Sequence, residues 1–261
     1  MDSVHTDVIH GIFVVTIDRP DVRNAVDART AGELAQAFRH FAADDALPVA
    51  VLTGSGDTFC AGADLKAASS GHGANRVTLD GDGPMGPTRM DLDKPVIAAV
   101  EGHAVAGGLE LALWCDLRVA ARNAIFGVYC RRWGVPLVDG GTVRLPRLVG
   151  QSNALDLILT GRGVSGDEAL RMGLVNYLCE PGRAIDEALA LARRIAAFPQ
   201  KCMRADRRSA RSQWNLDEAA ALRAETTWGL EVIQSGETLA GATRFARGAG
   251  RHGRFEDPTP E

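Results

Sequence analysis

The chain lacks an excess of positive charge. Its 261 residues carry 29 basic side chains against 33 acidic ones, and only three of the basic residues are lysines. A formal net charge of −4 excludes the broad basic field that gathers nucleic acids or anionic membranes. We therefore expect no nucleic-acid partner and no membrane partner, and an anionic ligand would need a local cation.

Long hydrophobic runs and paired cysteines are also missing. The first ten residues contain no basic segment followed by an apolar one, and polar or charged side chains interrupt the longest apolar stretch, residues 95–121. The five cysteines are scattered and never form a C-x-x-C pair, so we expect neither a disulfide framework nor a metal site. These features predict a soluble cytoplasmic protein with reduced thiols.

The 46% of residues that are hydrophobic are enough for a substantial core in a chain of this length. Two β-type runs, Val4–Ile9 and Ile12–Ile17, flank Gly11 and predict a hairpin. Apolar residues with helical spacing from Leu34 to Phe41 predict a helix capped by Asp27. Further strands at 49–53, 95–100 and 117–121, with a helix at 108–115, predict an α/β architecture.

Residues 66–90 are rich in Gly, Ser, Asp and Pro and show no periodicity. They predict a loop, which is either a functional lid or a tolerated surface insertion. After residue 150 the pattern predicts a helix at 153–159, a capping box from Ser165 to Glu168, a strand at 174–178 and a helix reaching Ala196. Residues 200–211 and 216–233 predict two more helices. We interpret 1–198 as a catalytic core and 199–261 as a helical appendage for self-association.

Two short segments contain residues suited to chemistry. In residues 59–65 (FCAGADL), small side chains allow the backbone to approach a ligand closely. Residues 101–110 (EGHAVAGGLE) run into a helix whose N-terminus exposes unpaired N–H donors and a partial positive charge. Each segment alone fits an ordinary turn or helix start. Together they supply two backbone donors and the Glu110 carboxylate, which an enzyme needs to stabilise an enolate and move a proton.

These segments, together with residues 18–25, 140–146 and 159–175, follow the order and spacing of a known family. The chain resembles the crotonase (enoyl-CoA hydratase/isomerase) superfamily over nearly its whole length. The resemblance implies a repeated β-β-α core, a C-terminal helical trimerisation region, and a homotrimer or a dimer of trimers. It also implies an acyl-CoA substrate and no separate cofactor, because coenzyme A is part of the substrate.

The resemblance also implies roles for individual positions. The backbone N–H groups of Ala63 and Gly107 match the oxyanion hole for the thioester carbonyl, and Glu110 matches the glutamate that activates water. Arg23 would supply the local cation for coenzyme A, and Lys66 would add to it. The positions expected to contact coenzyme A are Val22, Arg23, Ala61, Asp64, Leu65 and Lys66.

The sequence departs from the hydratase pattern at the second glutamate, where Cys130 stands. A thiol with a pKa of ~8.5 is a poor acid–base catalyst near neutrality. Asp139 offers a replacement, since some isomerases and aryl-CoA dehalogenases of the superfamily use an aspartate at this spacing. Asp139 could equally be the N-cap of a helix that starts near Gly140.

Several aromatic and basic side chains lie near Cys130, and they would either shape an acyl pocket or make packing contacts; they are Tyr129, Arg131, Arg132 and Trp133. We expect His103 to be a structural histidine. The favoured function is enoyl-CoA hydratase chemistry in fatty-acid or related acyl-CoA metabolism. The alternatives are an enoyl-CoA isomerase, an Asp139-dependent acyl- or aryl-CoA hydrolase or dehalogenase, and a non-catalytic acyl-CoA-binding subunit.

Overall fold

The computed structural model describes residues 2–250. They form two compact units, one ending at Ala192 and the other beginning at Arg193. The expected boundary after residue 198 therefore lies within the second unit. The last part of the expected appendage, residues 251–261, lies outside the described residues.

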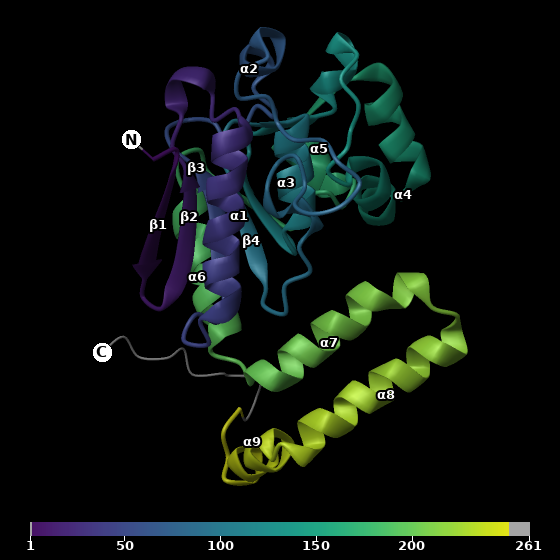
Figure 1. Cartoon of the computed structure of the whole chain (residues 1–261). Coiled ribbons are helices and arrows are strands. Elements are labelled where there is room, and N and C mark those ends of the chain that lie inside the picture. The colour runs from purple at the N-terminus through teal and green to yellow at the C-terminus, as the bar shows by residue number, and fades with distance from the viewer. Residues whose placement is uncertain (1, 251–261) are drawn as a thin grey trace. The chain divides into compact units, whose positions relative to one another are not determined.

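A six-stranded sheet forms the centre of the first unit (Figure 1). The predicted hairpin is confirmed with its bounds, because β1 and β2 pair antiparallel around Gly11, whose φ is +77°. The other strands pair in parallel, as an α/β architecture requires. In sheet order the strands are β1 (Val4–Ile9), β2 (Ile12–Ile17), β3 (Ala50–Gly54), β4 (Val96–Val100), β6 (Leu117–Ala121) and β9 (Tyr177–Cys179).

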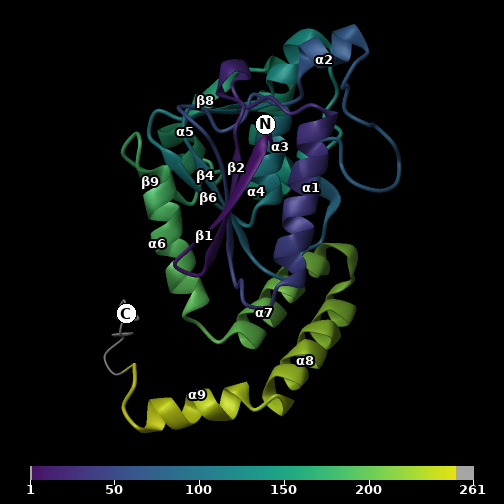
Figure 2. The same ribbon diagram turned by 60° about the vertical axis from the view of Figure 1, so that its left-hand side comes forward.

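Helices cover this sheet, and Figure 2 shows α1 (Ala28–Ala43) and α6 (Ala184–Ala196) on opposite sides of it. Asp27 caps α1 as predicted, because its side chain accepts a hydrogen bond from the Thr30 amide. The predicted face of α1 is buried, including Leu34 and Phe38. Every residue of α3 (Gly107–Trp114) is buried, so side chains on this helix can face only the core or an internal cavity.

A second, three-stranded sheet was not predicted. It consists of β5 (His103–Val105), β7 (Ile125–Gly127) and β8 (Gly163–Ser165). An isolated bridge between Cys60 and Ala104 holds the segment 59–65 against its first strand. The two candidate segments of the sequence therefore lie side by side.

Some predicted elements need correction. The supposed loop at 66–90 contains α2 (Leu65–Ser70), capped by Asp64, and a 3₁₀ turn, η2 (Pro87–Arg89). The helix expected at 153–159 belongs to α4 (Gly141–Thr160), which starts well before it and is kinked at Gly150, where φ is 76°. The strand expected at 174–178 is β9. The Ser165 cap is confirmed at the start of α5 (Gly166–Arg171).

The second unit is helical. It contains α7 (Gln200–Ser212), a short 3₁₀ turn, η4 (Gln213–Asn215), α8 (Glu218–Gln234) and α9 (Glu237–Ala246), the last of which was not predicted. Helices α7 and α8 pack against each other as a hairpin (Figure 1). Within residues 2–250, no helix combines the length and the apolar character needed to cross a membrane.

Candidate active site

A cavity of about 410 Å³ lies in the first unit, and both candidate segments contribute to its wall. Ala61, Ala63 and Leu65 come from the first segment, and Ala106, Gly107 and Glu110 from the second. The lining also includes Tyr129, Cys130, Trp133 and Asp139. Most of the remaining lining is apolar, as in sites that bind small molecules.

The amides of Ala63 and Gly107 are brought together by a close backbone approach. A Cβ atom added to Gly62, whose φ is +98°, would lie 2.9 Å from the Gly107 nitrogen, so only glycine permits this contact. Gly107 is the first residue of α3, and its N–H has no partner in the helix. Within residues 2–250, neither the Ala63 amide nor the Gly107 amide donates a hydrogen bond to a backbone carbonyl in a turn, loop or cap. Both are therefore available to a ligand oxygen.

Glu110 projects from the first turn of α3 and is only 2% exposed. Its Oε1 accepts hydrogen bonds from the backbone amides of Asp139 and Gly141, both at 2.8 Å. Burial raises its pKa to about 7, against the lowering effect of the Gly141 amide, and the nearby Asp139 carboxylate adds to the rise. A carboxyl group in this state can give or accept a proton near neutral pH.

Asp139 is also buried, at 3% exposure. The N-cap interpretation is wrong, because Gly140 is the N-cap of α4, and the side chain that bonds to the first amide of this helix is Glu110 and not Asp139. Instead, Asp139 Oδ1 accepts hydrogen bonds from the Met85 amide, at 2.9 Å, and from the Thr88 hydroxyl. Burial raises the pKa of Asp139, although the Thr88 hydrogen bond opposes the rise. The side chain is thus directed to the cavity wall rather than to the helix.

Cys130 lines the same cavity within the 3₁₀ segment η3 (Tyr129–Trp133) and is 6% exposed. Its burial and, secondarily, the Glu110 carboxylate raise the pKa of the thiol. The thiol is therefore protonated near neutrality. Glu110 and Asp139 are the two carboxyl groups that line the same cavity.

Residues 7–254 match the family model described as enoyl-CoA hydratase/isomerase. The chain belongs to this family. It is 37% identical to the enoyl-CoA hydratase EchA19 of Mycobacterium tuberculosis over 90% of each chain. It is 41% identical to the carnitinyl-CoA dehydratase of Salmonella enteritidis over 74% of each. The crystal structure of enoyl-CoA hydratase EchA1 from Mycobacterium marinum superposes with a TM-score of 0.89, at 38% identity, covering 95% of this chain and 96% of that one.

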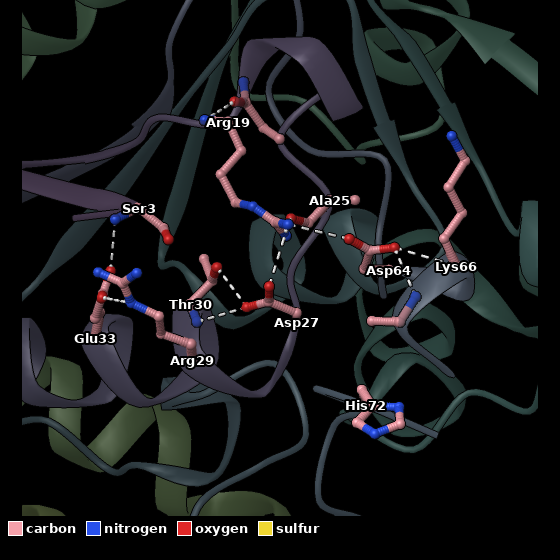
Figure 3. A network of polar contacts seen from close by, with 12 residues as sticks. Ser3, Arg19, Ala25, Asp27, Arg29, Thr30, Glu33, Asp64, Lys66 and His72 are labelled. Carbon is pink, nitrogen blue, oxygen red and sulfur yellow. Dashed lines mark hydrogen bonds and ion pairs between the residues drawn. The ribbon is translucent and has the colours of Figure 1, made fainter. Parts of the chain in front are cut away.

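Six positions of this enoyl-CoA hydratase/isomerase family member were expected to contact coenzyme A. Three of them line the cavity, namely Arg23, Ala61 and Leu65. Val22 and Lys66 do not, and Lys66 is exposed. The Asp64 carboxylate is occupied elsewhere, because it bonds to Arg19 at 3.1 Å and caps α2 through the amides of residues 66 and 67 (Figure 3). Asp64 therefore links the start of α2 to Arg19.

Sequence reasoning missed several wall residues of the family's site. Ala74, Asn75, Val77, Pro84 and Met85 line the cavity, so the 66–90 segment covers the site and is more than a surface insertion. No sequence periodicity marks these positions, because they are placed by long-range contacts.

His103 lines the cavity and is half-buried, and its expected structural role stays a prediction. Of the flanking basic residues, Arg131 and Arg132 bond to carbonyl oxygens of Ile158 and Gly161, which supports the packing interpretation. Tyr129 and Trp133 reach the cavity. Within residues 2–250, no cluster of three potential ligand side chains is arranged to hold a metal ion.

Proposed function

We propose that the protein is an acyl-CoA lyase that adds water across, or removes water from, the C2–C3 bond of an acyl thioester. The observation that carries this proposal is the placement of Glu110 and Asp139 in one cavity with the Ala63 and Gly107 amides. The names of relatives as enoyl-CoA hydratase and carnitinyl-CoA dehydratase support the same chemistry.

In this proposal the thioester carbonyl oxygen accepts hydrogen bonds from the Ala63 and Gly107 amides. Negative charge develops on this oxygen as the enolate forms, so the two donors bind the transition state more tightly than the ground state. The N-terminus of α3 adds a partial positive charge at Gly107. Loss of one such donor typically costs about 2.7–4 kcal/mol of transition-state stabilisation.

The two carboxyl groups have complementary proton roles. In the dehydration direction, ionised Asp139 accepts the C2 proton, and protonated Glu110 donates its proton to the departing 3-hydroxyl group as water forms. In the hydration direction, Glu110 accepts a proton from the attacking water and Asp139 returns one to C2. The raised pKa of Glu110, about 7, suits a group that must hold and release a proton. Asp139 thereby takes the part of the glutamate that Cys130 replaces.

We further propose that Arg23, Ala61 and Leu65 contact the coenzyme A portion, with Arg23 as the cation for its phosphates. The acyl group would lie against Val135 and Val138, which line the cavity and are close to Asp139 in the chain. No separate cofactor takes part in the proposed reaction, because the coenzyme A thioester supplies the activating carbonyl group.

Double-bond isomerisation is the second candidate. It is favoured by the absence of the second glutamate, because isomerisation needs only one carboxyl group. This group removes a proton from C2 and returns it to C4 of the resulting dienolate, or carries it in the reverse direction. A panel of enoyl-, dienoyl- and aryl-CoA thioesters, with products identified by mass spectrometry, tests both. Addition of the mass of one water molecule to an enoyl thioester indicates hydration, and a product of unchanged mass but altered retention indicates isomerisation. Binding without turnover of any thioester would contradict both proposals.

The C-terminal unit supports a proposal about assembly. Helices α8 and α9 expose large apolar side chains, including Leu222, Ile233, Leu239 and Phe245, and exposed apolar patches commonly mark interaction surfaces. We propose that these helices mediate a homotrimer or a dimer of trimers in the cytoplasm. Light scattering on the full chain distinguishes these states, and a monomeric mass would contradict the proposal.

A further inference from the structure

The segment of residues 83–88 has no place in the proposed chemistry so far, but it is closely fitted to the site. Its turn is closed by the Gly86 amide, which donates to the Gly83 carbonyl at 2.8 Å. A Cβ atom on Gly86, whose φ is +92°, would lie 2.5 Å from the Ala31 carbonyl oxygen of α1. The turn therefore rests directly on α1, which fixes its position relative to the core.

From this position the segment supplies two donors to a single carboxylate oxygen. The Met85 amide and the Thr88 hydroxyl both bond to Asp139 Oδ1. Thr88 is 1% exposed, so water does not compete for its hydroxyl group. A Cβ atom on Gly83 would lie 2.7 Å from Asp139 Oδ1 and would collide with the Thr88 hydroxyl. Only glycine at position 83 allows this contact.

A side chain of α4 connects the same two segments from the other side. Arg144 Nη1 donates to the Asp139 carbonyl at 2.8 Å, and its Nη2 donates to the Thr88 carbonyl at 2.6 Å. The backbones at positions 88 and 139 are thus held by one guanidinium group, in addition to the hydrogen bond between their side chains. The Asp139 carboxylate has little freedom to rotate.

We propose that Thr88 is a positioning residue, which together with the Met85 amide holds Asp139 Oδ1 and directs Oδ2 at the C2 proton of the bound thioester. The catalytic part of this inference rests on the proposed function. The hydrogen bond itself, and its effect on the charge state of Asp139, do not depend on which reaction the enzyme performs.

Other charged groups also act on Asp139. The Glu110 carboxyl group faces it from α3, Arg144 from α4, and Arg89 from η2, while the Cys130 thiol lies on the same cavity wall. Burial is the strongest influence and favours the neutral acid. The Thr88 hydroxyl is the largest opposing influence, because a donated hydrogen bond stabilises the ionised carboxylate.

The first test is a titration of the full-length protein without substrate. Carbon-13 NMR of labelled aspartate carboxyl groups follows the protonation of Asp139, and the resonance lost in Asp139→Asn assigns it. Thr88→Val removes the hydroxyl and should raise the Asp139 midpoint by about one pH unit. Thr88→Ser keeps the hydroxyl and should leave the midpoint near the wild-type value. Thr78→Val is the matched control, because it removes a hydroxyl that bonds to the Asp80 carbonyl in the same segment.

The second test uses turnover of whichever thioester is a substrate. The acidic limb of the kcat/KM profile should move to higher pH in Thr88→Val but not in Thr88→Ser or Thr78→Val. Should Thr88→Val not fold, Thr88→Ala removes the same hydroxyl with a smaller side chain and should give the same shift. An unmoved Asp139 midpoint in either variant, or a Thr88→Ser protein that behaves like Thr88→Val, overturns the inference. A shifted midpoint in a protein that turns over no thioester would retain the hydrogen-bond effect and reject the proposed function.

Discussion

Glu110→Gln is the substitution that tests the site most directly. Glutamine keeps the carbonyl oxygen that corresponds to Oε1, so it can still accept the hydrogen bonds from the amides of Asp139 and Gly141. The other oxygen becomes an amide nitrogen, which cannot take up or release a proton near neutral pH. The substitution therefore removes proton transfer and retains the shape of the cavity wall.

The expected loss of activity follows from the contribution of general acid–base catalysis, which is typically 10²–10⁴-fold. We expect kcat to fall by at least about 10², equivalent to about 2.7 kcal/mol of activation free energy. Binding of the thioester should change little, because the Ala63 and Gly107 amides and Arg23 are untouched. KM should therefore stay within a few-fold of the wild-type value.

The same substitution should stabilise the fold at alkaline pH. Burial raises the pKa of Glu110 from 4.5 to about 7. The contribution of the protonated Glu110 side chain to the free energy of unfolding is therefore fully present below pH 4.5 and is lost as the pH rises through about 7. The difference between these two pKa values corresponds to a loss of about 3 kcal/mol in the free energy of unfolding. This is an upper limit, because the side chain borders a cavity. Glutamine does not ionise, so Glu110→Gln should gain stability relative to wild type between pH 5 and pH 8.

Urea denaturation of both proteins at pH 5 and pH 8, at one protein concentration, measures this difference. Steady-state turnover of the same preparations measures kcat. Equal pH dependence of the two unfolding free energies would show that Glu110 ionises as freely in the folded state as in the unfolded one. Unchanged turnover would remove Glu110 from the proton-transfer role.

Three further predictions concern neighbouring positions. Asp139→Asn should lower kcat by about 10² without loss of thermal stability, because asparagine can still accept the hydrogen bonds to Oδ1; a destabilised protein with full turnover would contradict this. Cys130→Glu should increase hydration of crotonyl-CoA if the cavity accepts the second glutamate of the hydratase pattern, with Cys130→Gln as the size-matched control; equal rates in both variants would contradict it. Arg23→Gln should raise KM for acyl-CoA by about tenfold or more with little change in kcat, whereas Lys66→Gln, outside the cavity lining, should not; matching KM values would exclude Arg23 as the phosphate contact.

Local sequence patterns predicted the parts of the fold that depend on near neighbours. The hairpin from Val4 to Ile17 follows from β-type runs around Gly11, and α1 follows from its apolar spacing and the Asp27 cap. A helix start near Gly140 was considered, but its continuation into the helix expected at 153–159 was not predicted, because Pro146 and Gly150 interrupt the pattern. The small sheet of β5, β7 and β8 was missed because each strand has only three residues.

The residues of the site also include some that the sequence revealed and others that only the folded chain showed. The segments around Ala63 and Gly107, with Glu110, were found from their small residues and from the expected helix start, and the family resemblance implied the role of each position. The contribution of residues 74–85 to the cavity wall was left open, since composition alone cannot distinguish a lid from an insertion. His103 was expected to be structural, and only the folded chain shows that it borders the cavity.

By itself, the sequence determined the α/β architecture, the family resemblance and the identity of the chemical groups: two carboxyl groups, two segments of small residues whose amides can face a ligand, and a thiol at position 130. The tertiary structure decided where those groups lie and what they contact. Asp139 was equally compatible with a helix cap or a catalytic group until the fold excluded the cap, because its Oδ1 bonds to Met85 and Thr88, 54 and 51 residues away along the chain. Local patterns carry no information about such contacts, because the position of a distant segment is set by the packing of the whole core.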